Sequence, residues 1–240
     1  MPGAMNHPVN AEVWTGHLDR PPAQAELLRA VLSGEELRRA ARLRAEHART
    51  SFILSRAYLR GVLARYLKVP SARIPLAASP SGKPSVLGSE LRFNISHSGG
   101  LFVCIVAMGK EVGIDIERVR SLPDMARIAR RFFAPAELES WNRMPDAQRQ
   151  LAFFRCWTRK EAFLKATGDG LKRALDSFAV SLEVCAGNCL IAPPEDVSRW
   201  HVQSFAPADG FVGAIASAGE RFRIPRQLRD AERIAALARA

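Results

Sequence analysis

The chain has 240 residues, of which 48% are hydrophobic and 25% are charged, and its net charge is +11. This composition excludes an intrinsically disordered chain and is sufficient for one large domain or two small ones. The sequence shows no 18-residue apolar run and no apolar segment of the signal-peptide kind, so we expect a soluble, cytoplasmic protein.

The positive charge predicts an anionic partner: nucleic acid, a phosphorylated small molecule, an acidic protein or a membrane surface. Compositional use of arginine in place of lysine is an alternative source of part of this charge. Of the four cysteines, Cys104 and Cys156 lie in apolar surroundings and are interpreted as buried small hydrophobic residues. Cys185 and Cys189 have no partners at zinc spacing, so we expect reduced cysteines and no zinc site.

The first third of the chain is predicted to be mainly helical. A loose tail over residues 1–10 is followed by a strand at 12–18 and a helix at 23–32. A capping box begins at Ser33 and opens a long basic helical region, which continues as a packed helix over 51–66.

Arginines are frequent in the basic region: Arg38, Arg39, Arg42, Arg44 and Arg49. The simplest interpretation is a solvated helix face. An anion site is the sharper interpretation, because Arg49 lies where the basic face enters the buried part of the helix.

A turn at 79–84 precedes a short strand at 91–95, a polar turn at 96–100 and a strand at 101–108 that is apolar on both faces. Hydroxyls, an imidazole and open backbone N–H groups in the polar turn suit contact with phosphate. Taken alone, His97 is more often a structural hydrogen-bonding residue.

Residues 112–117 alternate as a strand does, with Gly113, Asp115 and Glu117 on one face. Two neighbouring carboxylates repel each other, and a glycine beside them packs little, so the pattern is poor as a purely structural choice. It suits a site for a hard cation, with oxygen ligands on a rigid strand and room for a ligand to approach.

Three helices are predicted next, at 125–133, from Pro135, and at 148–166. Glu161 and Lys165 are four residues apart on the last of these, and therefore share one side of it. A surface ion pair is the plain interpretation. With the acidic strand upstream, Glu161 becomes a candidate third carboxylate of the cation site.

Strands are expected at 178–184, 200–205 and 211–216, followed by a basic helical tail at 221–240. A helix followed by strands thus occurs twice, which suggests a repeat from element order alone. We predict an α/β (α+β) fold with two pseudo-symmetric subdomains, each a small sheet packed with helices. The expected divisions are 1–109, 110–220 with the metal-binding carboxylates, and the tail 221–240.

These motifs resemble those of 4′-phosphopantetheinyl transferases of the surfactin-synthetase-activating type. The resemblance covers roughly residues 33–217 and is carried by the stretches 47–49 (His-Ala-Arg), 82–84 (Gly-Lys-Pro), 93–99 (Phe-Asn-Ile-Ser-His-Ser-Gly), 112–117 (Val-Gly-Ile-Asp-Ile-Glu), 131–133 (Arg-Phe-Phe) and 157–165 (Trp-Thr-Arg-Lys-Glu-Ala-Phe-Leu-Lys). The two acidic motifs in this order and spacing are its most specific part.

The resemblance implies that coenzyme A binds in the cleft between the subdomains. Its phosphopantetheine arm would be transferred to a serine of an apo acyl, peptidyl or aryl carrier protein, leaving 3′,5′-ADP. Mg²⁺, with Mn²⁺ as the alternative, would be held by Asp115, Glu117 and Glu161. Glu161, or a water bound to the metal, would be the base, and Lys165 would balance charge on the pyrophosphate.

The resemblance also implies a coenzyme A site formed by Arg44, Arg49, Gly82, Lys83, Pro84, Ser96, His97, Asp115 and Lys165. Arg49 and His97 would hold the 3′-phosphate, and Lys83 would lie by the adenine nucleotide. We expect a monomer that binds neither nucleic acid nor a membrane. The alternatives are a metal-dependent nuclease or other nucleic-acid-binding enzyme, and a non-catalytic carrier-binding protein.

Overall fold

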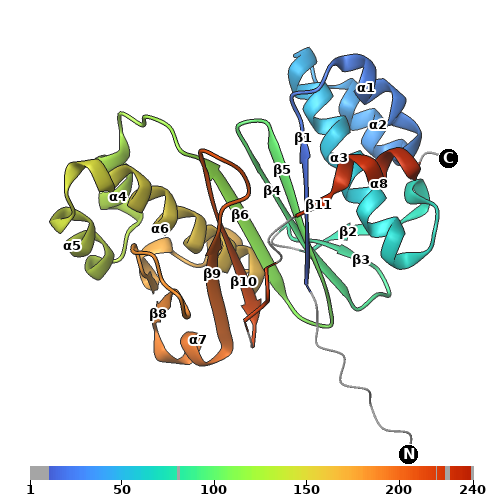
Figure 1. Cartoon of the computed structure of the whole chain (residues 1–240). Coiled ribbons are helices and arrows are strands. Elements are labelled where there is room, and N and C mark those ends of the chain that lie inside the picture. Colours follow the sequence, from blue (N-terminus) through green and yellow to red (C-terminus); the bar gives the residue numbers. More distant parts are fainter. Residues whose placement is uncertain (1–10, 80–81, 220, 225–227, 239–240) are drawn as a thin grey trace, which may run out of the picture.

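The computed structural model describes residues 11–79, 82–219, 221–224 and 228–238. Over this part of the chain it shows two halves, each a small β-sheet covered by helices (Figure 1). The predicted mixed α/β class with a sheet in each half is therefore confirmed. The tail expected at 1–10 lies outside the described residues.

The first half is formed by β1 (Glu12–His17), α1 (Pro22–Leu27), α2 (Gly34–Ala41), α3 (Glu46–Leu67), β2 (Leu76–Ala78), β3 (Pro84–Val86), β4 (Leu91–Ser98) and β5 (Leu101–Met108). The second half is formed by β6 (Val112–Arg118), α4 (Met125–Phe132), α5 (Pro135–Arg143), α6 (Asp146–Thr167), β7 (Ala179–Val180), β8 (Leu190–Ala192), α7 (Pro194–Arg199), β9 (Trp200–Phe205) and β10 (Phe211–Ala218).

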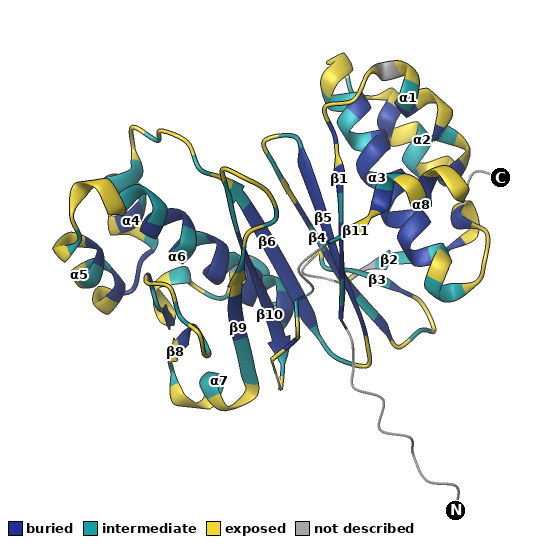
Figure 2. Cartoon of the chain, viewed as in Figure 1, coloured by how far each residue is buried: buried dark blue, intermediate teal, exposed yellow. Residues whose placement is uncertain are grey.

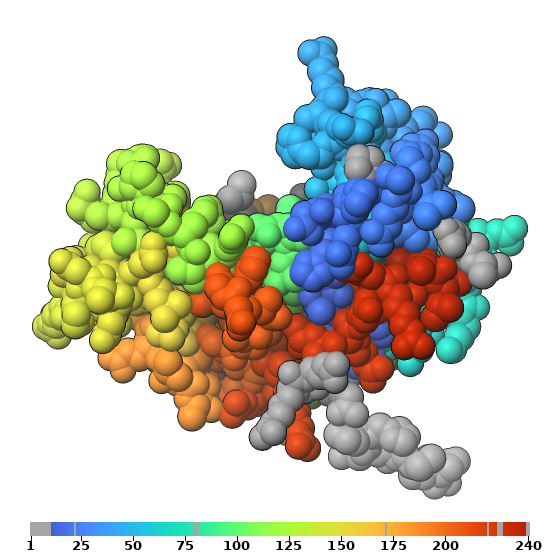
Figure 3. All heavy atoms as spheres, turned by 45° about the horizontal axis from the view of Figure 1, so that its top comes forward, coloured from blue at the N-terminus to red at the C-terminus, as the bar shows by residue number. Residues whose placement is uncertain are grey.

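The last elements return to the first half. They are β11 (Arg229–Asp230), which pairs in parallel with β1, and α8 (Ala231–Leu237), which packs against α3. In Figure 3 these red segments lie against the blue N-terminal ones. The packing is close because α3 carries Gly61 at the contact, where a Cβ would come within 3.0 Å of the backbone of Ala235. Where it is described, the predicted C-terminal tail thus completes the first sheet and its helical cover.

The two halves have the same strand connectivity. In the first, β1 pairs with β5 and β5 pairs with β4, all antiparallel; in the second, β6 pairs with β10 and β10 with β9 in the same way. A 22-residue helix follows the first strand of each half, α3 in one and α6 in the other.

The two sheets pack on each other between α3 and α6. One face of β5 contributes Phe102, Cys104 and Val106 to the core under α3, and its other face joins Ile114 and Ile116 of β6 in a separate apolar core. This arrangement explains why the strand predicted to be apolar on both faces is buried on both (Figure 2).

Local sequence signals set several element boundaries. Ser33 and Glu36 form the predicted capping box at the start of α2. The basic helical region is not continuous, because the chain leaves the helix after Ala41 and re-enters it at Glu46. Helix α6 ends at Thr167 and is capped by Gly168, whose positive φ of 77° suits a residue without a Cβ.

Several predicted element boundaries were wrong. The helix expected at 23–32 ends at Leu27. The polar turn expected at 96–100 is confined to Gly99 and Gly100, because residues 96–98 still pair with β5. The strand expected at 178–184 is limited to Ala179–Val180, since its partner β8 has only three residues.

Cys104 and Cys156 are buried, as predicted. The expectation of reduced cysteines is wrong for the other two, because Cys185 and Cys189 form a disulfide. The two cysteines are four residues apart in the connection from β7 to β8. The chain folds back there and brings the Cα atoms of Cys185 and Cys189 to 6.1 Å, a spacing compatible with a disulfide. Among the described residues, no helix has both the length and the apolar character needed to cross a membrane.

Candidate functional site

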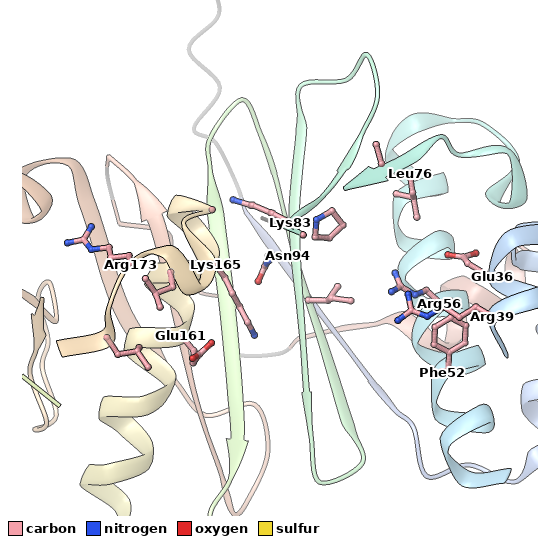
Figure 4. Close-up of a pocket in the computed structure, with 18 of the residues that line it drawn as sticks. Glu36, Arg39, Phe52, Arg56, Leu76, Lys83, Asn94, Glu161, Lys165 and Arg173 are labelled. Atoms are coloured by element: carbon pink, nitrogen blue, oxygen red, sulfur yellow. The ribbon is translucent and has the colours of Figure 1, made fainter. Parts of the chain in front are cut away.

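A cleft of about 880 Å³ lies between the two halves (Figure 4). The first half contributes parts of α2 and α3, residues 82–84 and the middle of β4 to its walls. The second contributes the end of α4, the C-terminal turns of α6 and parts of the connection from 168 to 176. In Figure 4, Glu161 and Lys165 lie on one side, and Arg39, Phe52 and Arg56 on the other.

The polar residues of β4 join the two sheets behind this cleft. Alternate side chains on the strand accept hydrogen bonds from backbone N–H groups of β6: Asn94 from Ile114 (3.0 Å), Ser96 from Ile116 (3.4 Å) and Ser98 from Arg118 (3.1 Å). These contacts satisfy N–H groups of a strand that has no backbone partner on that edge. The Asn-Ile-Ser-His-Ser motif therefore has a structural role in fixing β6 beside β4.

Two of these serines also orient the acidic residues. Ser96 Oγ donates to Asp115 Oδ1 (2.8 Å), and Ser98 Oγ donates to Glu117 Oε2 (2.6 Å). Lys165 Nζ is 2.7 Å from the same Oδ1 of Asp115. The carboxylates of β6 are therefore held by residues from both halves of the chain.

The environment of Asp115 is unusual for a carboxylate. The residue is 6% exposed, and its Oδ2 is buried without a hydrogen-bond partner among the described residues. Burial raises the pKa of Asp115, the contacts with Lys165 and Ser96 oppose this effect, and Glu117 adds to it. The site therefore holds an acceptor atom with no donor.

Glu161 faces the cleft from α6. Its side chain has no hydrogen bond and no ion pair with any residue that the structure describes. Burial raises the pKa of Glu161, the negative charges of Asp115 and Glu117 raise it further, and Lys165 lowers it. The i,i+4 surface pair considered for Glu161 and Lys165 is not formed, because Lys165 bonds to Asp115 instead.

Among the described residues, no three His, Cys, Asp or Glu side chains converge as a metal-ligand group. The three predicted ligands nevertheless interact electrostatically, since Asp115 and Glu117 both affect the pKa of Glu161. The ammonium of Lys165 donates a hydrogen bond to Asp115 and balances the negative charge of its carboxylate.

The room expected beside Gly113 is filled by the backbone of α6. A Cβ at this position would lie closer than 3.0 Å to the carbonyl oxygen of Ala162 and the amide nitrogen of Ala166. The glycine thus serves close helix–strand packing rather than approach of a ligand. This packing brings Glu161 and Lys165 to the acidic strand.

The structure brings five of the predicted site residues to the walls of the cleft: Gly82, Lys83, Pro84, Glu161 and Lys165. It leaves the others outside the described lining: Arg44, Arg49, Ser96, His97, Asp115 and Glu117. Ser96 is turned toward β6, and His97, the next residue in the strand, therefore points to the opposite face, where it is exposed.

Sequence reasoning missed the far end of the cleft. Arg39 of α2 and Arg56 of α3 lie over the ring of Phe52, with the guanidinium carbons 5.3 and 5.5 Å from its centroid. A buried ion pair between Arg60 and Glu36 holds α2 on α3. The sequence showed Arg39 only as one of several arginines on a basic helix, with no signal that set it apart.

Sequence reasoning also missed a buried ion pair that supports the cleft wall formed by the second half. Lys160 and Glu137 form a buried ion pair of 2.8 Å, and both residues are almost fully excluded from solvent. Lys160 also donates to the carbonyls of Leu175 and Phe178, both at 2.7 Å. Because Leu175 lines the cleft, this pair fixes part of its wall.

Comparison with known families agrees with this architecture. The profile of the 4′-phosphopantetheinyl transferase superfamily matches residues 111–234, and that of the 4′-phosphopantetheinyl transferase N-terminal domain matches residues 20–110. The chain therefore belongs to the 4′-phosphopantetheinyl transferase family.

Individual relatives align over most of their length. The chain is 39% identical to the 4′-phosphopantetheinyl transferase HetI of Nostoc sp. over 212 residues, which cover 86% of this chain and 87% of the relative. It is 31% identical to a 4′-phosphopantetheinyl transferase of Bacillus subtilis and 29% identical to the transferase Sfp of the same species, with 88% of this chain and 94% of each relative covered.

The protein is accordingly an enzyme that transfers 4′-phosphopantetheine from coenzyme A to apo carrier proteins. The transferase prediction is confirmed. The nuclease and the non-catalytic carrier-binding protein, which were the alternatives, are set aside.

Proposed function

We propose that the cleft between the two halves is the active site, with coenzyme A bound along it and its pyrophosphate next to Asp115, Glu117 and Glu161. The observation that carries this proposal is the buried, unpartnered Oδ2 of Asp115, whose other oxygen bonds to Lys165 of the cleft wall. Glu117 and Glu161 add negative charge to the same site, since Asp115 and Glu117 both affect the pKa of Glu161. A buried acceptor without a donor is costly in a folded protein and indicates a ligand.

The three carboxylates fit the Mg²⁺ that this family typically uses. Burial raises the pKa of Asp115 and of Glu161. Glu117 raises both pKa values further, and Asp115 also raises that of Glu161, so a divalent cation would offset this repulsion. Asp115, Glu117 and Glu161 would hold the ion, and Mn²⁺ would also suit oxygen ligands. When bound, the ion neutralises charge on the phosphate oxygens.

Glu161 is our candidate for the base. Burial in the cleft wall raises the pKa of Glu161, which makes it a better proton acceptor than an ordinary glutamate. It would take the proton of the carrier's serine hydroxyl as the serine oxygen bonds to the phosphorus next to pantetheine. The bond from that phosphorus to the bridging oxygen breaks, and 3′,5′-ADP leaves.

Lys165 would offset the charge that develops on the leaving group. Its ammonium is already in the cleft, bonded to Asp115 Oδ1 at 2.7 Å and to Ser96 Oγ at 3.2 Å. A cation paired with Asp115 in this way is positioned before the substrate arrives, which reduces the reorganisation needed in the reaction.

The nucleotide end of coenzyme A would lie toward the first half. Arg39 and Arg56 are guanidinium groups in the cleft that can bind phosphate, and we propose them for the 3′-phosphate alongside the predicted Arg49 and His97. Gly82, Lys83 and Pro84 would form the wall at the nucleotide. Packing of two similar halves on each other within one chain supports the expected monomer.

The test is single-turnover transfer to an apo carrier protein, followed by intact mass, with the Glu161→Gln variant. The amide keeps the shape of the side chain but does not accept the proton, so we expect the rate to fall at least about 100-fold at saturating coenzyme A. Glu183→Gln is the matched control, since Glu183 is exposed and its carboxylate has no described partner. A wild-type rate and pH profile for Glu161→Gln would exclude Glu161 as the base.

A thermal melt gives a second readout that does not depend on activity. Without metal, Glu161→Gln should melt at the wild-type temperature or above it, because one repelling charge is gone. Added Mg²⁺ should stabilise the wild type and the Glu183→Gln control but have little effect on Glu161→Gln. Equal stabilisation of all three proteins by Mg²⁺ would mean that Glu161 is not a ligand.

A further inference from the structure

Lys83 connects the two walls of the cleft. It belongs to the segment between β2 and β3, in the first half, but its ammonium lies on the second half. Lys83 Nζ donates to Glu111 Oε2 at 2.6 Å and to the carbonyl oxygen of Ala166 at 2.7 Å. Its side chain is only 15% exposed.

Both acceptors are well suited to a cation. The carbonyl of Ala166 belongs to the last turn of α6, where carbonyl groups lack helical partners and the helix dipole is negative. Glu111 is itself fixed from its other side, because Arg92 Nε donates to Glu111 Oε1 at 2.8 Å and Arg92 Nη1 donates to the carbonyl of Ser89. The carboxylate therefore lies in a defined place between two cations.

The backbone around Lys83 is fixed by the same segment. Lys83 N donates to Ser79 Oγ at 3.1 Å, and Ser79 N donates to the carbonyl of Lys83 at 2.9 Å. A fixed backbone and a fixed ammonium together hold the wall formed by Gly82 and Pro84 at one distance from α6. Ala166, which accepts the bond from Lys83, directly follows Lys165. Lys83 therefore contacts the same helical turn that carries Lys165.

We propose that Lys83 is a positioning residue, which acts with Glu111 as a clip that sets the spacing between the nucleotide wall and the end of α6. This inference rests on the proposed function, in that it takes the cleft as the coenzyme A site. It assigns a role to Glu111 and Arg92, and it gives Lys83 a role other than direct binding of a substrate phosphate.

The two roles for Lys83 predict opposite effects of a change at Glu111. If Lys83 binds a phosphate, Glu111 competes for its charge, and Glu111→Gln strengthens coenzyme A binding or leaves it unchanged. If Lys83 is a clip, the same substitution releases the wall and weakens binding. The sign of the change therefore separates the two roles.

The experiment is calorimetric titration of the full chain with coenzyme A, for Lys83→Met, Glu111→Gln and the double variant. We expect each single variant to bind about five- to tenfold more weakly than the wild type, and the double variant no more weakly than either. Glu90→Gln removes the same charge from an exposed side chain without a described partner, and should bind within about twofold of the wild type. Glu111 is 43% exposed, so its substitution should not prevent folding even if that of Lys83 does.

If Glu111→Gln binds coenzyme A as tightly as the wild type or more tightly, the proposed positioning role of Lys83 and Glu111 is wrong. It is also wrong if the losses of affinity in the two single variants add up in the double variant. Arg39→Ala separates this failure from that of the proposed site. If Arg39→Ala weakens binding and Glu111→Gln does not, only the clip is wrong. If neither substitution nor Lys83→Met changes the affinity for coenzyme A, the assignment of the cleft is wrong as well.

Discussion

Gly113→Ala provides a stringent test of how α6 is placed on the acidic strand. The added methyl group would lie closer than 3.0 Å to the carbonyl oxygen of Ala162 and the amide nitrogen of Ala166, and 3.0 Å from the Cα of Ala166. All three are backbone atoms, so no side chain can rotate away. Helix α6 would have to move from β6 by roughly 1 Å to restore ordinary contact distances.

The size of the effect follows from this displacement. Inserting a methyl group into a packed core costs about 1–3 kcal/mol, and we expect the upper end because backbone atoms face it. For a chain of this length, 3 kcal/mol corresponds to a decrease in Tm of about 6–12 °C. The 2.7 Å contact between Lys165 and Asp115 would lengthen beyond hydrogen-bonding distance. Misplacement of reacting groups by about 1 Å can lower a rate about 100-fold.

The assay combines thermal unfolding with single-turnover transfer, measured well below the Tm of the variant. Gly187→Ala is the matched control, since a Cβ there would have no neighbour within 4 Å and the residue does not have a positive φ. We expect this control to unfold and react as the wild type does. If Gly113→Ala matches the control in both Tm and rate, α6 does not lie against β6 as described, and the placement of Glu161 and Lys165 is wrong.

Three further predictions follow from other contacts. Glu137→Ala should lower the free energy of unfolding by about 3–5 kcal/mol in urea, because it leaves a buried ammonium without its partner, whereas Glu139→Ala removes only an exposed ion pair and should have far less effect. In calorimetry, Arg39→Ala should weaken binding of coenzyme A more than binding of its 3′-dephospho analogue. For Arg49→Ala the difference between the two ligands should be smaller, since of these two arginines only Arg39 lines the described cleft. The reverse order would place the 3′-phosphate at Arg49. Burial favours a higher pKa for Glu111, but its two cationic neighbours, Lys83 and Arg92, outweigh this and hold the pKa below the usual value of 4.5. The stability that Glu111 contributes is therefore present above about pH 4.5 and is lost as the pH falls through the lower folded-state pKa. In urea titrations, the free energy of unfolding should fall less on acidification for Glu111→Gln than for the wild type, and an equal fall in both proteins would contradict this.

The sequence by itself determined the family, the order of most of the longer helices and strands, and the residues that carry charge. It did not predict the short strands β2, β3, β8 and β11 or helix α7. Alternation predicted the acidic strand, and the capping box predicted the start of α2, because both signals depend on neighbouring residues in the chain. The spacing of Glu161 and Lys165 on one helix was likewise a local property. The identification of the transferase required no contact between distant elements, because its motifs are short and occur in a set order.

Only the tertiary structure decided what these residues touch. Ser96 was a candidate for phosphate contact, but the approach of β6 to β4 makes it a hydrogen-bond partner of the acidic strand. Gly113 was interpreted as space for a ligand, but α6 fills it. The Gly-Lys-Pro motif singled out Lys83 but not its partners, and Arg39 differs little from the other arginines of the basic region. Folding brought Lys83 to the end of α6 and Arg39 to the cleft. Such contacts join residues tens of positions apart, and local periodicity holds no information about them.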